Sequence, residues 1–498
     1  MKRLATLAGL LALFLQVALG QSANGVANAK RNAQVDTVLQ RLGRGFMAQP
    51  ARVGLSVGII KDGQTYFYNF GEVEKGKGQA PTQRTVYEIA SISKTFASLL
   101  LAQAIIEQRV KATDDIRKYL GPTYANLAYQ GQPIRLIHLA NTTSALPDNL
   151  PDLTAFYKQV NPDSVAVVAN RKLKNYTKQN FYEDLRRVKP DTIPGVVPRH
   201  SNVATQLLAY ILEGVYQAPY QELLAKYIEK PCGMQDAHAF ETEASLLATG
   251  YNENGSHMAN QSIATMQASG GLRYSVANMV KYLHYQLNER TKAVALTHQP
   301  TWGTPEGEAI GYNWNIAKTV DSKRTLFHSG GSFGFASHCA FYPELGLGIV
   351  LLTNESDRNT QASLYDLSDQ IVQGIYGTPA ALKAFQQQLL AQKYEQAAAI
   401  YKAVKAEHRE FYLPEEYVNE WGYKLARAGK TQPAIALFKL NAVLYPKSWN
   451  TYDSLGEAYE IAGNKPLAVA NYQRSLTLNP KNAGAVEHLK KLGQTTSK

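Results

Sequence analysis

Hydrophobic and β-branched residues gather in two runs between residues 53 and 69, one on each side of Lys61-Asp62-Gly63. Asp-Gly between two such runs is a strong signal for a β-hairpin. The pattern therefore predicts two antiparallel strands in this part of the chain.

The pattern becomes helical over residues 91–110, where apolar residues recur at spacings of three and four: Phe96, Leu99, Leu100 and Ala104. Helical patches and loops follow, and strand character returns from Leu326, with runs at 337–342 and 348–353. Strands from both ends of a domain, with helices between them, predict an antiparallel sheet flanked by helices and an all-helical insert. This is an α+β fold.

The C-terminal part repeats itself at an interval of 34 residues. Four positions recur in the same small, aromatic or proline class, as Gly422, Ala434, Phe438 and Pro446 and then as Gly456, Ala468, Tyr472 and Pro480. This period and residue set are typical of tetratricopeptide helix pairs, which we predict over residues 413–498. Residues 376–412 are expected to be a helical linker or a degenerate repeat. Because about three repeats are needed for stability, the module is expected to lean on the preceding helix or domain.

The length of 498 residues predicts two or three domains, and a hydrophobic content of 45% is enough to bury a sizeable core. These values exclude a fibre, a disordered chain and a small disulfide scaffold. The 52 Lys and Arg exceed the 40 Asp and Glu, which gives a net charge of +12, but they form no long basic run. A nucleic-acid partner is therefore not expected.

The N-terminus has the order of a secretory signal peptide. Lys2 and Arg3 precede an apolar stretch, residues 4–19, which closes on small residues at Ala18-Leu19-Gly20. Residues 1–20 are therefore predicted to direct export to the periplasm or the extracellular space and to be removed there. No transmembrane span is expected after that cleavage.

Two cysteines, Cys232 and Cys339, allow one disulfide at most. Whether they are bonded depends on the distance between their Cα atoms, which the sequence leaves open. Our interpretation is that both are ordinary buried small residues.

Two pentapeptides, at residues 54–58 and 330–334, match the G-x-S-x-G nucleophile motif. That motif requires a sharp turn from a strand into a helix, which exposes the serine. Both matches run into predicted strands instead, so neither Ser56 nor Ser332 is expected to be a nucleophile. Their glycines are interpreted as requirements of tight sheet packing.

Ser91-Ile92-Ser93-Lys94 is the one S-x-x-K match in the chain. About one match is expected by chance in a chain of this length, so its context decides. It opens the predicted helix, which places Ser91 and Lys94 one turn apart on one face, near the positive end of the helix dipole. A desolvated amine can have its pKa lowered enough to take the proton of a serine. The alternative is a serine N-cap followed by a solvated lysine.

The run Tyr-Glu-Ile-Ala-Ser-Ile-Ser-Lys-Thr-Phe at residues 87–96 resembles the active-site helix of the class C β-lactamase-related serine hydrolases. This family includes penicillin-binding proteins, esterases and D-aminopeptidases. The resemblance extends over roughly residues 50–375, because Asp114-Asp115-Ile116, Pro194-Gly195 and Gly270-Gly271-Leu272 follow in the family's order. It implies a serine hydrolase domain, which we place at residues 21–375.

The resemblance implies roles for particular residues. Ser91 would be the nucleophile that forms an acyl-enzyme, and Lys94 would help to deprotonate it. The family's second motif, Tyr-x-Asn, is matched here by His200-Ser201-Asn202, in which Asn202 would bind the substrate's amide. His200 replaces the proton-shuttling tyrosine, and an imidazole can also accept and return a proton near neutral pH. The alternative is a structural histidine in a site of reduced activity.

The family's third motif, Lys/His-x-Gly, is matched by His328-Ser329-Gly330. His328 would face the leaving group or a carboxylate, and Gly330 would let the substrate backbone approach the strand. The backbone N–H groups of Ser91 and Gly331 would form the oxyanion hole. In the segment 142–147 the family usually shows His-x-Ser-Gly-Leu-Pro, whereas this chain has Thr142 and Ala145 in place of the His and Gly. This departure is expected to reshape the pocket.

Together these features predict an exported serine hydrolase that cleaves an amide, a β-lactam or an ester of a small molecule or peptide through an acyl-serine intermediate. No metal or other cofactor is expected, because the histidines lack metal-ligand spacing. One alternative is a weak or inactive hydrolase fold that binds a cell-wall peptide. Another is a scaffold that binds a protein partner through its C-terminal repeats.

Overall fold

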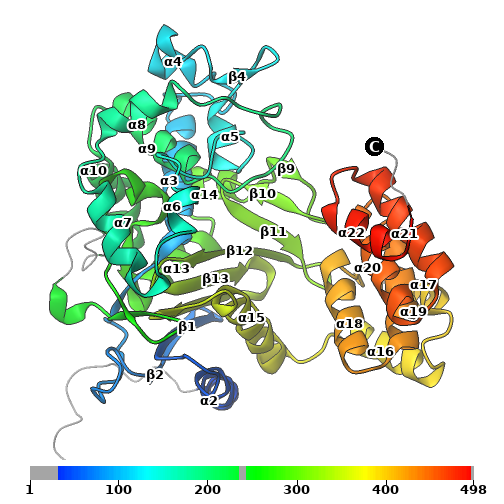
Figure 1. The fold of residues 1–498 in the computed structure, drawn as a ribbon. Coiled ribbons are helices and arrows are strands. Elements are labelled where there is room, and N and C mark those ends of the chain that lie inside the picture. Colours follow the sequence, from blue (N-terminus) through cyan, green and yellow to red (C-terminus); the bar gives the residue numbers. More distant parts are fainter. Residues whose placement is uncertain (1–31, 235–242, 495–498) are drawn as a thin grey trace, which may run out of the picture.

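The computed structural model describes residues 32–234 and 243–494, and the predicted signal peptide lies outside the described residues. An eight-stranded antiparallel sheet forms its centre (Figure 1). In spatial order the strands are β2 (Gln64–Gly71), β1 (Gly54–Lys61), β14 (Leu347–Thr353), β13 (Ala336–Tyr342), β12 (Arg324–Gly331), β11 (Trp314–Lys318), β10 (Ala309–Gly311) and β9 (Trp302–Gly303). The predicted α+β arrangement is confirmed.

The two ends of the domain meet in the middle of this sheet. β1 pairs with β14 in the register Ser56↔Leu352 and pairs on its other side with β2. The β1–β2 hairpin turns at Asp62 and Gly63, which both have positive φ (52° and 74°), as a two-residue turn of this type requires. The predicted hairpin is thus confirmed.

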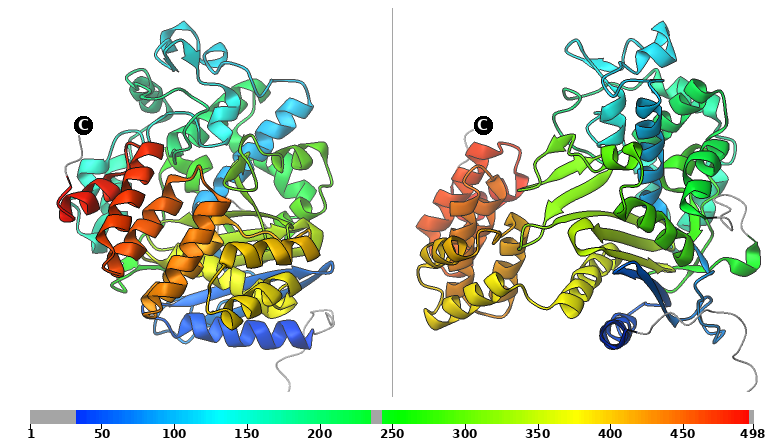
Figure 2. Two further views of the ribbon diagram at one scale, coloured as in Figure 1. Left: turned by 90° about the vertical axis from the view of Figure 1, so that its right-hand side faces the viewer. Right: turned by 180° about the vertical axis from the view of Figure 1, so that it is seen from behind.

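Helices cover both faces of the sheet. On one face, α2 (Ala33–Met47) and α15 (Thr360–Tyr376) pack on the odd-numbered side chains of β1. On the other face, α13 (Val276–Leu287) packs on β1 and β14, and α3 (Ser93–Ile106) lies in the same core (Figure 2). Because both faces are covered, every residue of β13 and β14 is buried.

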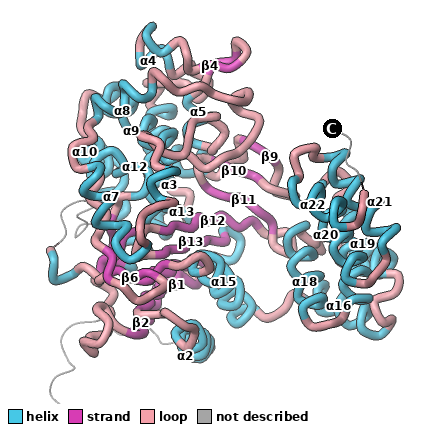
Figure 3. Tube along the Cα trace, in the orientation of Figure 1, coloured by secondary structure: helices cyan, strands magenta, loops and turns pink. Residues whose placement is uncertain are grey.

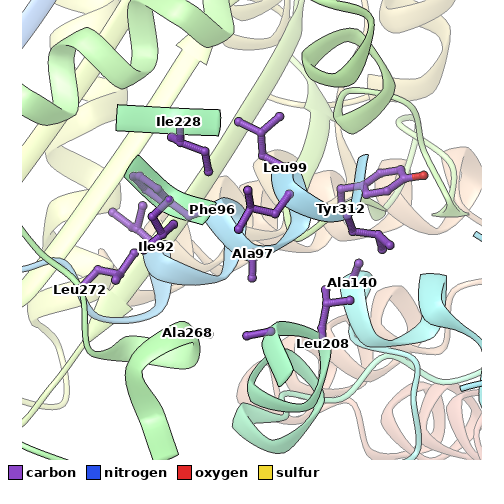
Figure 4. Close-up of a cluster of buried hydrophobic side chains, with 14 of the residues drawn as sticks. Ile92, Phe96, Ala97, Leu99, Ala140, Leu208, Ile228, Ala268, Leu272 and Tyr312 are labelled. Atoms are coloured by element: carbon purple, nitrogen blue, oxygen red, sulfur yellow. The ribbon is translucent and has the colours of Figure 1, made fainter. Parts of the chain in front are cut away.

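The helical insert surrounds α3. Its helices are α4 (Arg117–Leu120), α5 (Leu136–Ala140), α6 (Thr154–Tyr157), α7 (Val165–Leu173), α8 (Lys178–Leu185), α9 (Asn202–Tyr216), α10 (Tyr220–Leu224), α11 (Lys230–Cys232), α12 (Gln267–Gly270) and α14 (Lys292–Thr297). Figure 4 shows Phe96 and Ala97 of α3 among side chains from several of these elements. Phe96 stacks on Tyr282 with ring centroids 4.1 Å apart. The start of α3 is therefore fixed from several sides.

Short strands complete the domain. They are β3 (Val86–Glu88), which pairs with β8 (Arg273–Ser275), β4 (Ala128–Tyr129) with β5 (Gln132–Pro133), and β6 (Gly250–Asn252), which lies between β7 (His257–Met258) and β15 (Glu355–Ser356). The β3–β8 pair leads the chain directly into the turn that carries Ser91.

The C-terminal region is entirely helical among its described residues (Figure 3). It contains α16 (Ala380–Ala391), α17 (Ala397–Glu407), α18 (Glu415–Arg427), α19 (Thr431–Leu444), α20 (Trp449–Ile461), α21 (Lys465–Leu478) and α22 (Ala483–Lys491). A Cβ on Gly422 would lie 2.6 Å from the Phe438 ring, and one on Gly456 would lie 2.8 Å from the Tyr472 ring. The repeated glycines therefore let paired helices approach the repeated aromatics, while the tetratricopeptide assignment itself stays a prediction.

The helical region packs against the sheet domain, as its small number of repeats led us to expect. Val320, in the β11–β12 connection, packs against the apolar cluster of α16–α19. The Tyr412 N–H donates to Val320 O at 2.8 Å, and Ser322 Oγ donates to Glu410 O at 2.6 Å. These contacts tie the first part of the helical region to one end of the sheet.

The two cysteines are not bonded to each other. Cys339 is buried in β13, as expected, whereas Cys232 is partly exposed at the end of α11. Within residues 32–234 and 243–494, none of the helices combines the length and the apolar character needed to cross a bilayer.

Candidate active site

Ser91 lies on a tight turn in front of α3. Residues 90–92 form a single 3₁₀ turn, and the α-helix begins at Ser93, two residues later than the sequence pattern predicted. Ala90 has a φ of +47°, a conformation that costs energy for a residue with a Cβ. Two hydroxyl groups brace the turn, since Ser337 Oγ donates to Ile89 O at 2.7 Å and Ser93 Oγ donates to Ala90 O at 2.6 Å.

Lys94 is buried directly behind Ser91, with 1% of its surface exposed. Its Nζ lies 2.9 Å from Ser91 Oγ, 2.8 Å from Asn202 Oδ1 and 2.6 Å from Ser269 O. Burial lowers the pKa of Lys94 to about 7, and the charge of Asp148 opposes this change. The solvated lysine of the alternative interpretation is therefore excluded.

These contacts leave one direction free for proton transfer. A neutral amine has two N–H groups and one lone pair, and the oxygens of Asn202 and Ser269 accept the two N–H groups. The lone pair then points at the hydroxyl of Ser91. With a pKa near 7, a large share of Lys94 is neutral at physiological pH, so the pair has the geometry and the proton affinity of a nucleophile and its base.

His200 lies at the mouth of the site and is paired with Asp148, whose Oδ1 is 2.6 Å from His200 Nδ1. Both side chains are 54% exposed. Partial burial would raise the pKa of Asp148, but the hydrogen bond and charge of His200, together with Lys94, lower it, so the carboxylate is ionised. In the described part of the chain, Lys94 and not His200 is the group hydrogen-bonded to the hydroxyl of Ser91.

Asn202 is held at the first turn of α9. Ser201 is the N-cap of this helix and its Oγ accepts from the Ala204 N–H at 3.0 Å. The Asn202 side chain bridges Lys94 Nζ and Asn149 Oδ1, to which its Nδ2 donates at 3.0 Å. Asn202 is therefore a partner of Lys94 in addition to its expected contact with substrate.

Strand β12 places the third motif beside Ser91. A Cβ on Gly330 would lie 2.6 Å from Ile89 O and 2.8 Å from Ser91 N. The Cβ direction of Gly330 is thus filled by the Ser91 turn, which by itself requires glycine here, and the expected approach of a substrate backbone to the strand stays a prediction. Glycine at this position lets β12 lie against the Ser91 turn, while the pairing of the Ser91 and Gly331 N–H groups as oxyanion donors stays a prediction.

His328 carries no positive charge in this arrangement. Its Nδ1 lies 2.7 Å from Ser329 O, and because a carbonyl oxygen can only accept, Nδ1 must carry the proton. Burial and the neighbouring Lys94 lower the pKa of His328 to about 3. The expected role of facing a carboxylate therefore lacks electrostatic support.

These residues surround a cavity of about 500 Å³. Of the site residues predicted from sequence, Ser91, His200, Asn202, His328 and Gly331 line it. Sequence reasoning missed the remaining lining residues, which are Asn149, Tyr157, Gln261, Met266, Ser269, Gly270, Ser329, Ser332, Phe333 and Gln361. Two sequence features point to part of this set. Asn149 comes shortly after residues 142–147, where the chain departs from the family's usual motif. Ser269 and Gly270 lie at the Gly270-Gly271-Leu272 motif.

The two G-x-S-x-G serines are not nucleophiles of the elbow type. Ser56 is buried within β1 and bonded to Tyr87 and Asn69. Ser332 leads into β13, not into a helix. A Cβ on Gly58 would lie 2.4 Å from Val280 of α13, so this glycine serves the packing of a helix on the sheet, as expected.

A family model described as Beta-lactamase matches residues 39–372 of the chain. The chain belongs to the Beta-lactamase family. This membership confirms the resemblance read from residues 87–96 and makes the protein a serine β-lactamase-related hydrolase at the level of the family. The match covers the central sheet and its helices, and the helices from α16 onward lie beyond it.

Curated relatives of this β-lactamase-family chain are distant. D-alanyl-D-alanine-carboxypeptidase/endopeptidase AmpH of Escherichia coli (strain K12) is 24% identical over 342 residues, which cover 65% of this chain and 85% of AmpH. A β-lactamase of Pseudomonas fluorescens is 24% identical over 371 residues, covering 66% and 94%. Protein flp of Staphylococcus aureus (strain MRSA252) is 26% identical over 354 residues, covering 68% and 66%.

Proposed function

We propose that this protein is an exported serine hydrolase that cleaves an ester or amide through an acyl-Ser91 intermediate. The observation that carries the proposal is the buried pair in which Lys94 Nζ lies 2.9 Å from Ser91 Oγ. An inactive binding protein would have no need of a desolvated amine aimed at a serine, because burying it costs stability.

The acylation step follows from the contacts. Lys94 takes the proton of Ser91, and Oγ attacks the carbonyl carbon of the substrate. The N–H groups of Ser91 and Gly331 stabilise the oxyanion of the tetrahedral intermediate. The bond to the leaving group then breaks, the leaving group takes up a proton, and water later releases the acyl group from Ser91.

His200 is assigned the return of the proton to the leaving group. Asp148 accepts a hydrogen bond from His200 Nδ1, which leaves Nε2 free to exchange a proton in the cavity. A carboxylate that fixes the tautomer of a histidine is a common device in acyl transfer. The tyrosine of the family motif is thus replaced by an oriented imidazole.

Labelling with an uncharged fluorophosphonate, followed by intact-mass measurement, tests the proposal. Wild-type protein should gain one label and Ser91→Ala none. Ser332→Ala is the matched control, since Ser332 also lines the cavity but lacks the bonded lysine that Ser91 has; this variant should be labelled like the wild type. No label on the wild type, or a label that persists in Ser91→Ala, would disprove the acyl-Ser91 mechanism.

The exported location is supported by the signal-like residues 1–20. N-terminal analysis of protein recovered from the periplasm or medium should show a chain that begins near Gln21. A chain that retains Met1 and stays in the cytoplasm would contradict export.

A further inference from the structure

The described lining of the cavity around Ser91 has no permanent cation, and His200 at its mouth is paired with the carboxylate of Asp148. Among the described residues that line the cavity there is no lysine, arginine, aspartate or glutamate. Lys94 is buried beneath Ser91, and its nitrogen is already engaged by three oxygens. In the reactive form Lys94 is also neutral, because it must accept a proton.

The third-motif histidine does not supply a cation either. Nδ1 donates to Ser329 O, and burial together with Lys94 lowers the pKa of His328 to about 3, so the ring is neutral and its Nε2 is an acceptor. The hydroxyl of Ser329 is paired with His338 Nδ1 at 2.8 Å. A carboxylate at this end of the cavity would meet a lone pair on His328 where a lysine would have offered an ammonium group.

An ionised carboxylate flanks the cavity. Asp148 lies just outside the cavity. Its charge acts to raise the pKa of Lys94, and burial together with this charge raises the pKa of Tyr157. A substrate carboxylate would therefore enter the cavity next to a like charge. Such a placement is unfavourable and weakens binding.

One wall of the cavity is apolar. The rings of Tyr157 and Phe333 have centroids 6.3 Å apart and planes tilted by 52°, and Met266 lines the same cavity. Tyrosine, phenylalanine and methionine favour contact with aromatic or other apolar groups. Gln261 and Gln361, whose side-chain amides carry no charge, also line the cavity.

We infer that the cavity selects uncharged acyl substrates, esters or amides with an aromatic or other apolar group, and discriminates against those with a carboxylate next to the scissile bond. D-alanyl peptides and penicillins carry such a carboxylate. The inference rests on the proposed acyl-Ser91 mechanism, and it separates this chain from the D-alanyl-D-alanine activity in the name of AmpH.

A matched pair of thioesters tests this selection. N-benzoyl-D-alanyl thioglycolic acid and its methyl ester differ only in one carboxylate on the leaving group. Ser91 Oγ forms a bond to the acyl carbon, the C–S bond breaks, the proton of Ser91 passes through Lys94 or His200 to the thiolate, and water completes hydrolysis. After correction for reaction with hydroxide, kcat/KM for the methyl ester should exceed that for the acid by roughly tenfold.

A charge-gain variant sharpens the test. The Gln361 amide lies against Gly331 at the end of β12, since a Cβ on Gly331 would be 2.5 Å from Gln361 Nε2. Gln361→Lys should raise the acid-to-ester ratio of kcat/KM by about tenfold, in a manner that falls with added salt. Gln361→Met, of similar length but neutral, should leave that ratio at the wild-type value.

The outcomes separate the inference from the function beneath it. If the wild type hydrolyses the acid as well as or better than the methyl ester, the selection for uncharged substrates is refuted while acyl-Ser91 chemistry stands. An equal rise in the ratio for Gln361→Lys and Gln361→Met would also refute it, since charge would then not be the cause. If neither thioester reacts and the fluorophosphonate adds no mass, the proposed function fails, and the inference falls with it.

Discussion

The rate of acylation should titrate with Lys94. We expect kcat/KM for an uncharged ester to rise about tenfold per pH unit below pH 7 and to level off above it. The reason is that only the neutral amine of Lys94 can take the proton of Ser91. Burial, opposed by the charge of Asp148, brings the pKa of this amine to about 7.

The size of the effect follows from that pKa. A lysine with the ordinary value of 10.5 would be neutral in about one molecule in 3,000 at pH 7, whereas Lys94 is neutral in about half. Burial therefore increases the amount of active base by on the order of a thousandfold. Lys94→Arg, which keeps a charge that cannot be lost, should reduce kcat/KM by at least that factor.

The sign of the charge effect gives a second measurement. Because the carboxylate of Asp148 stabilises the protonated form of Lys94, Asp148→Asn should lower the pKa of Lys94 and move the midpoint of the profile to lower pH. His200→Gln should lower the plateau, since the leaving group loses its proton donor, but should keep the midpoint.

Ester hydrolysis measured between pH 5 and 9 for these proteins decides the assignment. A flat profile, or a midpoint that moves upward in Asp148→Asn, would refute the reasoning for Lys94. A midpoint that disappears in His200→Gln would transfer the role of base to His200. A parallel loss of folded protein, followed by circular dichroism across the same pH range, would expose a profile caused by unfolding.

Three further predictions concern other parts of the molecule. Ala145 has a φ of +60°, so Ala145→Gly should raise the free energy of unfolding in urea by roughly 0.5–1 kcal/mol, and a decrease would contradict strain at this loop. Gly456→Leu should clash with Tyr472 and speed hydrogen exchange in α20 and α21 while fluorophosphonate labelling persists; unchanged exchange would contradict the close packing. Phe333→Ala should reduce the preference for benzoyl over acetyl esters by about tenfold, and an unchanged preference would remove Phe333 from acyl recognition.

Local signals in the sequence predict the parts of the fold that local chemistry determines. The β1–β2 hairpin follows from Asp-Gly, and the contacts of Gly422 and Gly456 follow from the 34-residue period. The strands β9, β10 and β11 were missed, because elements of two to five residues are too short to show an alternating pattern. Their place in the sheet is set by pairing in succession, β11 with β12, β10 with β11 and β9 with β10, which is a tertiary interaction.

The same division applies to the site. Ser91 and Lys94 are three residues apart, so their spacing alone indicated a shared face. The backbone carbonyl of Ser269, 175 positions from Lys94 in the sequence, accepts a hydrogen bond from Lys94 Nζ, and a carbonyl has no sequence signature. The packing role of Gly330 was missed for a related reason, because only the folded chain reveals that the Ser91 turn occupies the space next to it.

The replacement of the motif tyrosine by His200 is best understood together with Asp148. Taken alone, the replacement suggested a weakened site. In the folded chain, Asp148 is bonded to His200 Nδ1 at 2.6 Å and also acts on the charge of Lys94. One carboxylate thus orients the imidazole and limits how far burial depresses the pKa of the amine. A carboxylate bonded to Nδ1 fixes the tautomer of the histidine, whereas in a histidine without such a partner the proton can lie on either ring nitrogen. The departure from the motif therefore favours an altered proton path over a lost activity.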